Sequence, residues 1–161
     1  MQIRKYDPAT DYAGLRNCIV ALQDYEYRID DRFPDGESMV DDYIPDIIYR
    51  SKLYEGDIFV AEVGAAIVGY AMVWARFKSG DVEDGDFECG LLADLAVLEE
   101  HRGKGYGKAM IDFAEQYVRD KGARYLRLGV MAKNTVAREL YERLGFTECH
   151  VDFEKDLAKT E

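Results

Sequence analysis

Residues 99–118, EEHRGKGYGKAMIDFAEQYV, join a glycine-rich turn to a helical pattern. The glycines stand at three alternate positions, Gly103, Gly105 and Gly107. The cations around them are Arg102, Lys104 and Lys108. A helix N-terminus has unpaired N–H groups and about half a positive charge, and glycine lets a ligand approach the backbone closely. The stretch therefore predicts a site for an anion such as phosphate.

Two well-known phosphate-binding motifs do not fit this turn. A P-loop, G-x-x-x-x-G-K-S/T, needs a glycine where Arg102 stands and a hydroxyl residue where Ala109 stands. The dinucleotide-binding pattern, G-x-G-x-x-G, lacks its last glycine whether it is counted from Gly103 or from Gly105. Neither class of nucleotide-binding protein is therefore indicated.

The pattern that does fit is Q/R-x-x-G-x-G/A, which residues 102–107 satisfy. A second motif, N-x-x-A-x-x-L/F-Y-x-x-x-G-F, follows as NTVARELYERLGF at residues 134–146. Its matching positions are Asn134, Ala137, Leu140, Tyr141, Gly145 and Phe146. On these two motifs, which with their flanking strands cover residues 91–153, the sequence resembles the GCN5-related N-acetyltransferase (GNAT) family. Members of that family use acetyl-coenzyme A (acetyl-CoA).

The resemblance implies a mixed α/β fold in three layers, α/β/α, with a central, mostly antiparallel sheet that splays at the cofactor site. Hydrophobic periodicity predicts the elements independently. Strands are expected at residues 1–7, 57–64, 66–77, 89–97, 125–131 and 146–157, and helices at 11–27, 37–55, 106–120 and 134–145. Thr10 or Asp11 is expected to cap the first helix, and Pro45 to interrupt the second. No repeat or linker divides the chain, so one domain is predicted over residues 1–161.

Composition excludes several classes of protein. The net charge is −11, with 32 acidic against 21 basic residues, which argues against a nucleic-acid partner. No apolar run approaches the roughly 20 residues that cross a bilayer, and the N-terminus lacks a signal-peptide pattern. The cysteines and histidines are few and lack metal-ligand spacing: Cys18, Cys89, Cys149, His101 and His150. We therefore expect no metal, no membrane association, reduced thiols and a cytoplasmic location.

The resemblance implies which residues contact the coenzyme. The turn would hold its pyrophosphate through Arg102, Gly103, Lys104, Gly105, Tyr106 and Gly107. The preceding strand would contact the pantetheine arm through Leu95, Ala96 and Val97. The backbone N–H of Val97 would polarise the thioester carbonyl, a contribution of about 3 kcal/mol for such donors. The alternative is that Leu95 and Val97 belong to an ordinary buried strand.

The second motif implies two further roles. Tyr141 would act as the general acid that protonates the departing thiolate, and Asn134 would contact the coenzyme. Each residue has a structural alternative. Tyr141 belongs to an apolar helical stripe with Ala137, Leu140 and Leu144, so it could be a core residue. Asn134 stands where a helix N-cap is expected.

An attacking amine must also lose a proton. A free alkylamine is about three pKa units from its neutral form at pH 7, an obstacle of roughly 4 kcal/mol. Asp94 and Glu88 are the two candidate carboxylates for a general base. Asp94 interrupts the apolar run LLADLAV, where burial of a carboxylate is costly and therefore suggests a functional role. The alternative is that Asp94 caps a backbone group. Glu88 closes an acidic loop at residues 79–88 and could simply be solvated.

The acceptor is expected to be cationic. Residues 24–46 hold nine acids against Arg28 and Arg32, and the loop at 79–88 adds five acids. Aromatic residues suited to cation–π contact are Tyr25, Tyr27, Phe33 and Tyr43. The alternative is that both stretches are solvated surface.

The function predicted is acetyl transfer from acetyl-CoA to a primary amine, directly within a ternary complex. Covalent transfer through Cys89 lacks a paired histidine. The alternatives are a non-catalytic acyl-CoA-binding module and a transferase for a different acyl group. Homodimers occur in the family and are allowed here.

Overall fold

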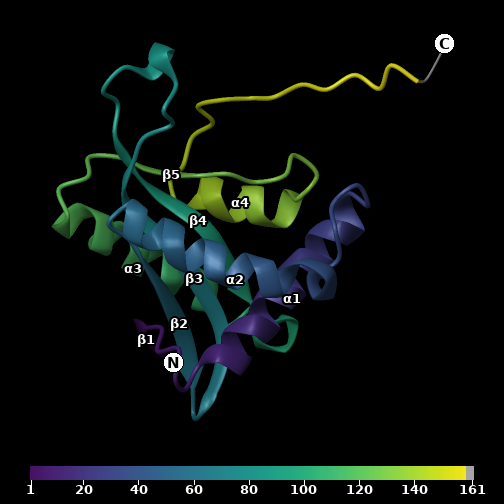
Figure 1. Ribbon diagram of the computed structural model, residues 1–161, viewed down its shortest axis with the longest axis vertical. Coiled ribbons are helices and arrows are strands. Elements are labelled where there is room, and N and C mark those ends of the chain that lie inside the picture. The colour runs from purple at the N-terminus through teal and green to yellow at the C-terminus, as the bar shows by residue number, and fades with distance from the viewer. Residues whose placement is uncertain (159–161) are drawn as a thin grey trace. The chain divides into compact units, whose positions relative to one another are not determined.

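The computed structural model describes residues 1–158 and contains five strands and four α-helices within them (Figure 1). In chain order these are β1 (Gln2–Lys5), α1 (Tyr12–Ile29), α2 (Gly36–Leu53), β2 (Asp57–Val63), β3 (Ala66–Phe77), β4 (Cys89–Val97), α3 (Tyr106–Asp120), β5 (Leu126–Leu128) and α4 (Thr135–Arg143). The chain forms two compact units, Met1–Gly129 and Val130–Glu161. The first holds the whole sheet and three helices, and the second holds α4.

The sheet has the strand order β1-β2-β3-β4-β5. Its first three pairings are antiparallel and the last, between β4 and β5, is parallel. A mostly antiparallel sheet was predicted, and the prediction is confirmed. The hairpin between β2 and β3 turns at Gly64, whose φ of +66° suits glycine.

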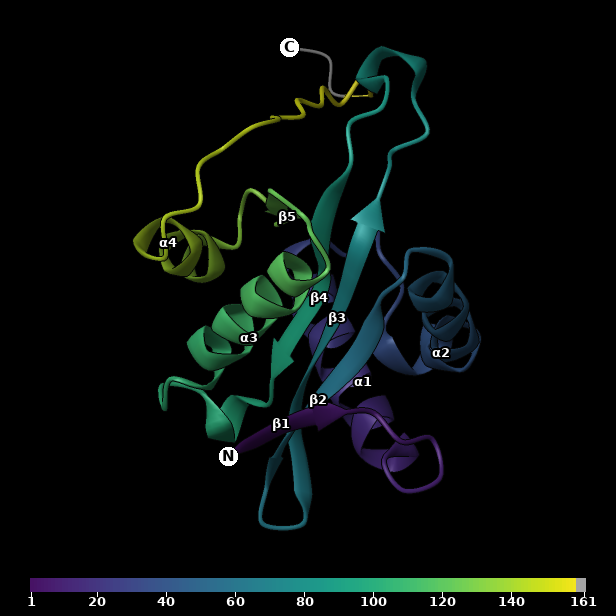
Figure 2. The same ribbon diagram turned by 90° about the vertical axis from the view of Figure 1, so that its left-hand side faces the viewer.

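Helices cover both faces of this sheet, as Figure 2 shows, with α3 on one face and α1 and α2 on the other. Apolar positions spaced three and four apart give each helix one buried face. Between the sheet and α1–α2 lie Leu15, Ile19, Val40, Ile44, Ile47, Val60, Tyr70 and Met72, all at most 3% exposed. On the opposite face α3 buries Met110, Ile111, Ala114 and Val118. The three-layer α/β/α arrangement is therefore confirmed.

Two expectations about the elements are wrong. The helix α2 continues through Pro45 without a break. Proline removes one helical hydrogen bond, but Val40, Ile44 and Ile47 bury their side chains on both sides of it, and this packing holds the helix together. Residues 146–157 have the alternation of a strand, yet they form none, because a strand needs a neighbouring ladder as well as a favourable pattern. No helix within residues 1–158 is long and apolar enough to cross a membrane.

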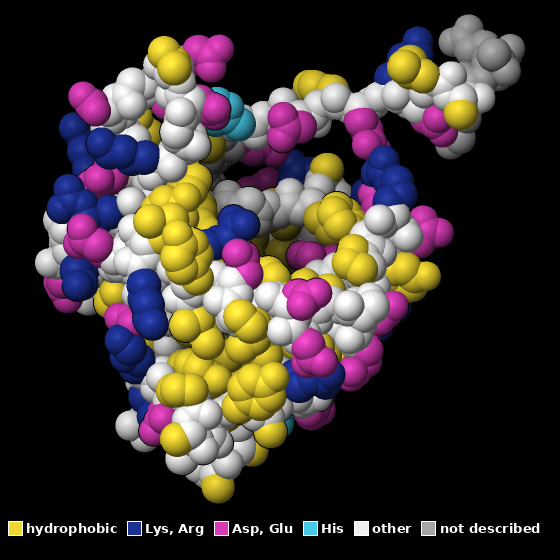
Figure 3. All heavy atoms as spheres, in the orientation of Figure 1, with side chains coloured by type: hydrophobic (Ala, Val, Ile, Leu, Met, Phe, Trp, Pro, Cys, Tyr) yellow, Lys and Arg dark blue, Asp and Glu magenta, His cyan; other side chains and the backbone are white. Residues whose placement is uncertain are grey.

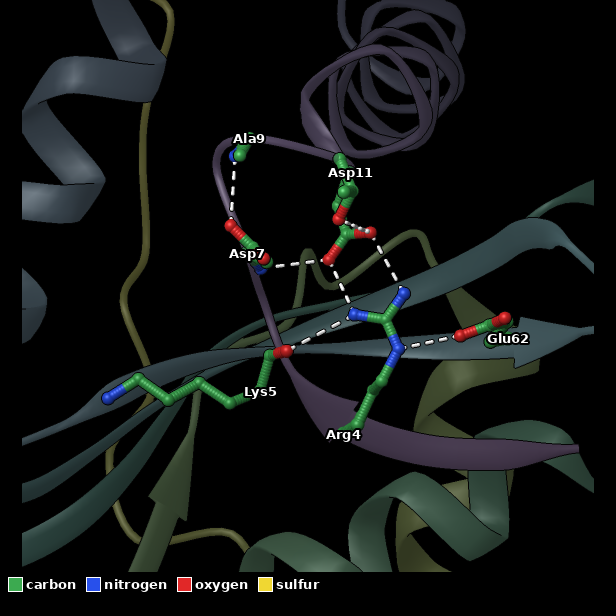
Figure 4. Close-up of polar contacts among 7 residues, drawn as sticks. Arg4, Lys5, Asp7, Ala9, Asp11 and Glu62 are labelled. Carbon is green, nitrogen blue, oxygen red and sulfur yellow. Dashed lines mark hydrogen bonds and ion pairs between the residues drawn. The ribbon is translucent and has the colours of Figure 1, made fainter.

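A partly buried group of ion pairs joins β1, β2 and the start of α1 (Figure 4). Arg4 donates to both carboxylate oxygens of Asp11, at 2.6 and 2.8 Å, and its Nε donates to Glu62 at 2.6 Å. The Asp7 backbone N–H also donates to Asp11, at 2.8 Å. Asp11 stands at the N-cap of α1 as expected, but its side chain makes no cap hydrogen bond because it serves Arg4 instead. These bonds hold the pKa of Asp11 well below its ordinary value of 3.8.

We predict that Asp11→Asn lowers the free energy of unfolding at pH 7 by about 2 kcal/mol, since it removes the carboxylate charge that accepts two bonds from Arg4 and leaves Arg4 only its bond to Glu62. Because the folded-state pKa of Asp11 is depressed, its contribution is present above about pH 4 and is lost as the pH falls below that. Urea unfolding at several pH values measures both effects.

The matched control is Asp41→Asn, because Asp41 is 75% exposed and lies 3.4 Å from Arg16. It should change stability by less than about 0.5 kcal/mol. Equal effects of the two substitutions, or a loss for Asp11→Asn that does not shrink at low pH, would contradict the prediction.

Candidate functional site

The strand β4 contains one extra residue relative to β3. Met72 pairs with Asp94, and the next residue, Val73, pairs with Leu92, so Ala93 has no partner of its own in β3. A bulge of this kind reverses the alternation of side chains along the strand. Asp94 consequently faces α1 and α2, whereas without the bulge it would face the same side as Leu92.

Beyond this bulge, no strand within residues 1–158 pairs with the edge of β4 that faces β5. Pairing with β5 ends at Leu92. The Leu98 N–H donates to the Val68 carbonyl of β3 at 2.9 Å, so alternation directs the amides of Leu95 and Val97 to the opposite, open edge. Ala96 pairs with Tyr70, and by the same alternation its amide faces β3. Of the three strand residues predicted to contact the coenzyme, Leu95 and Val97 thus present amides at this edge and Ala96 does not.

The glycine turn leads from this strand into α3. Gly103 and Gly105 have φ values of +72° and +81°, which favour glycine. Gly105 is the N-cap of α3, and no side chain of residues 1–158 caps this helix. In contrast, Asp35 caps α2 and Asn134 caps α4. The first-turn N–H groups of α3 therefore remain without a side-chain acceptor, and this arrangement fits a pyrophosphate.

The cations of the turn have partners within the first unit. Lys104 Nζ donates to the Glu100 carbonyl at 3.0 Å. Arg102 Nε donates to the Val97 carbonyl at 2.9 Å, so its side chain lies at the open edge of β4. The Arg102 guanidinium also lies 5.3 Å from the ring centroid of Tyr25 in α1. Tyr25, predicted to contact a cationic acceptor, already faces a cation of its own chain.

Asp94 is the centre of a polar cluster beneath α1 and α2. The hydroxyl of Tyr43 in α2 donates to Asp94 Oδ2 at 2.7 Å, and that of Tyr70 in β3 donates to the same oxygen at 2.9 Å. Burial raises the pKa of Asp94 and the two phenols lower it, with a net rise. Oδ1 has no hydrogen-bond partner within residues 1–158. Glu26 of α1 lies near Asp94. Burial raises the pKa of Glu26, and the charge of Asp94 raises it further.

The structure separates the two candidate bases. Glu88 forms an ion pair with Arg76, 3.1 Å from Glu88 Oε1 to Arg76 Nε, and both side chains reach solvent. Asp94 is held by neutral hydroxyls and keeps one oxygen available. Asp94 is therefore the better placed carboxylate.

Most acids of residues 24–46 do not gather into one pocket. Several have basic or backbone partners: Asp24 with Gly36 N–H, Asp30 with Arg32, Asp35 with Ser38 N–H, Glu37 and Asp41 with Arg16, and Asp46 with Arg50. Figure 3 shows acidic and basic side chains interspersed on the face that carries α2. Tyr27 and Phe33 are 42% and 47% exposed. Glu26 is the acid of this stretch whose pKa the charge of Asp94 raises.

Asn134 and Tyr141 belong to the second unit, Val130–Glu161. Asn134 is the N-cap of α4 and accepts a hydrogen bond from Ala137 N–H at 3.2 Å. Tyr141 is half-buried against Phe146, with ring centroids 5.9 Å apart. The structural alternative for Asn134 is confirmed, and the roles of both residues toward the coenzyme stay predictions.

Sequence reasoning missed Tyr70 and Glu26 as neighbours of Asp94, and it considered Tyr43 only as an aromatic ring. A tyrosine within the apolar run VGYAMVWA was the available signal for Tyr70, because a buried phenol needs a hydrogen-bond partner. Nothing in the local pattern distinguished Glu26 from the other acids of α1.

Comparison with known proteins shows the family of this chain. The sequence pattern of the acetyltransferase (GNAT) family matches residues 22–146. The chain belongs to this family. The N-acetyltransferase YycN of Bacillus subtilis is 44% identical over 91 residues, which are 56% of this chain and 54% of that protein. An N-alpha-acetyltransferase of Sulfurisphaera tokodaii is 32% identical over 103 residues, 62% of each chain. The matches thus span 54–62% of the length of these curated relatives.

Solved structures share the fold of this GNAT chain at low sequence identity. An aminoglycoside N-acetyltransferase in complex with CoA, AAC(6')-Iy, has a TM-score of 0.63 at 20% identity. The similarity covers 96% of this chain and 98% of that one. A Bacillus halodurans protein has a TM-score of 0.78 at 17% identity, covering 98% of this chain and all of the other.

We predict that Gly105→Asp weakens CoA binding at least about tenfold, equivalent to 1.4 kcal/mol. The new carboxylate would accept from the first-turn N–H groups of α3 itself and would repel a phosphate. Isothermal titration calorimetry with CoA measures the change.

The matched control is Gly122→Asp, at the other end of α3. Gly122 has a φ of +88°, so an aspartate there strains the backbone similarly without approaching the turn. Its affinity for CoA should stay at the wild-type value. If the two variants lose affinity equally, backbone strain is responsible, and if Gly105→Asp binds normally, the turn is not the site.

Proposed function

We propose that this protein is an acetyl-CoA-dependent N-acetyltransferase that acetylates a primary amine by direct transfer in a ternary complex. The observation that carries the proposal is Asp94, turned by the bulge at Ala93 toward α1 and α2 with one carboxylate oxygen free. A half-buried carboxylate of raised pKa, on the strand that leads into an uncapped helix, is what deprotonation of an amine beside a CoA site requires.

The residues present fit acetyl-CoA. The turn at residues 102–107 and the first N–H groups of α3 would hold the pyrophosphate. The outward amides of Leu95 and Val97 would pair along the pantetheine arm, with Val97 as donor to the thioester oxygen. When bound, acetyl-CoA supplies an activated acetyl group, whose bond to sulfur breaks as the bond to the amine nitrogen forms. Arg102 supports this edge, because it already binds the Val97 carbonyl.

Asp94 would take the proton that the amine loses. Val97 lies three positions after Asp94, about 10 Å along the strand. A proton would therefore reach Oδ1 through ordered water, or directly from an acceptor that extends along β4. In their ionised forms, Asp94 and nearby Glu26 would favour a cationic acceptor.

Tyr141 would donate a proton to the thiolate, and Asn134 would contact the coenzyme with the face that does not cap α4. The match of both residues to the second family motif supports these roles. We propose two classes of acceptor: a small cationic amine and the N-terminal amine of a basic peptide. The peptide class is suggested by the name of the N-alpha-acetyltransferase relative.

We predict that one class in a panel of spermidine, an aminoglycoside, basic peptides and neutral amino acids supports thiol release from acetyl-CoA. Asp94→Asn should lower kcat by about 10²-fold or more and remove the acid limb of the pH–rate profile. The limb arises because the unaltered carboxylate is protonated, and so inactive as a base, below its pKa.

The matched control is Glu88→Gln, which removes a carboxylate that is ion-paired with Arg76 at the surface. It should retain activity and the wild-type profile. If Glu88→Gln loses the limb and Asp94→Asn keeps it, the base is assigned wrongly. If no amine in the panel supports thiol release although the protein binds CoA, the protein is better explained as a binding module than as an enzyme.

We predict that Tyr141→Phe lowers kcat about 10²-fold with little change in the KM for acetyl-CoA, because it removes an acid but keeps the ring against Phe146. Tyr125→Phe serves as the control, since Tyr125 is an exposed tyrosine outside both motifs. Full activity of Tyr141→Phe would leave Tyr141 a packing residue.

A further inference from the structure

Both hydrogen bonds to Asp94 end on one oxygen. Tyr43 and Tyr70 donate to Oδ2 at 2.7 and 2.9 Å, and no residue within 1–158 donates to Oδ1. A carboxylate oxygen has two lone pairs in the carboxylate plane. With two phenol donors, Oδ2 is saturated, and a proton can be accepted at Oδ1 only.

We propose that Tyr43 is a positioning residue for Asp94: its hydroxyl, carried by α2, fixes the carboxylate plane and reserves Oδ1 for the proton of the acceptor amine. This inference rests on the proposed role of Asp94 as the base. Tyr43 differs from Tyr70 in its place in the fold. Tyr70 is fully buried in β3, whereas Tyr43 is half-buried in α2, a helix that covers the face toward which Asp94 points.

The surroundings keep both tyrosines in the donor state. Burial is the main cause that raises the pKa of both hydroxyls, and the charge of Asp94 raises it further. Neither hydroxyl therefore ionises in the pH range where an amine is acetylated. The other groups that face the cluster are Glu26 and Cys18 from α1 and, beside Tyr43, Asp46 from α2. Burial, with the charge of Glu100, raises the pKa of the Cys18 thiol to about 12, so it stays neutral.

The test is Tyr43→Phe in the full chain, which keeps the ring and removes only the hydroxyl. The matched control is Tyr49→Phe, because Tyr49 lies on the same helix and is 64% exposed. Loss of a donor to the ionised form raises the pKa of Asp94. The acid limb of kcat/KM against pH should move upward by about one unit, and kcat at the pH of half-maximal wild-type activity should fall severalfold. Tyr49→Phe should match wild type.

A second readout is independent of activity. The pKa of Asp94 can be followed by carbon-13 NMR of the aspartate carboxyl carbons, with Asp94→Asn identifying its signal. An upward shift in Tyr43→Phe, matched by the acid limb, supports the inference. An unchanged pKa overturns it.

The kinetic outcomes separate this inference from the proposed function. If Asp94→Asn abolishes the acid limb while Tyr43→Phe leaves it in place, only the role of Tyr43 is overturned. If Asp94→Asn keeps the limb, Asp94 is not the base, and the role of Tyr43 fails together with that assignment.

Discussion

A strand sends alternate side chains to opposite faces of its sheet, and one extra residue at Ala93 reverses that alternation in β4. Two consequences follow from this single irregularity. Asp94 turns to the face covered by α1 and α2, where two tyrosines meet it. The pairing with β5 stops at Leu92, just before the bulge, because a bulge increases local twist and disrupts the ladder. The same residue thus places a carboxylate on one face and frees backbone amides at the edge.

The segment from β4 to α3 carries a negative charge in its strand and positive charges in the turn that follows. Asp94 lies within β4, and the cations of the turn, from Arg102 onward, follow it at the start of α3. A strongly negative chain could repel an anionic coenzyme, but potentials near a site depend on local groups more than on net charge. Many acids near α1 and α2 are neutralised by partners such as Arg16 and Arg50. The bonds from Arg4 to Asp11 join β1 to the start of α1, and the bond from Arg4 to Glu62 joins β1 to β2. The same helix, α1, carries Glu26, which lies near Asp94.

The sequence predicts those elements whose patterns are local. The strand at 89–97 and the helix at 106–120 have the predicted bounds, since one is a continuous apolar run and the other an amphipathic helix that ends near Gly122. Asp94 was found as a carboxylate within an apolar run. Its hydrogen bonds were not, because Tyr70 and Tyr43 lie 24 and 51 residues away. The bulge has no glycine or proline to signal it. The absence of a strand at 146–157 and the continuation of α2 through Pro45 likewise depend on tertiary packing, which local sequence preference does not determine.

Two opposing effects set the proton affinity of Asp94. Burial alone would favour the neutral acid, which cannot accept a proton. Two phenol donors stabilise the anion, yet they are weaker than an arginine partner such as the one that holds Asp11 far below its ordinary pKa. An arginine beside Asp94 would keep it ionised but make it a poor base. With neutral hydroxyls as its partners, Asp94 keeps a raised pKa. A general base must be ionised before the reaction and basic enough to take a proton during it, so it needs both the phenol donors and the burial.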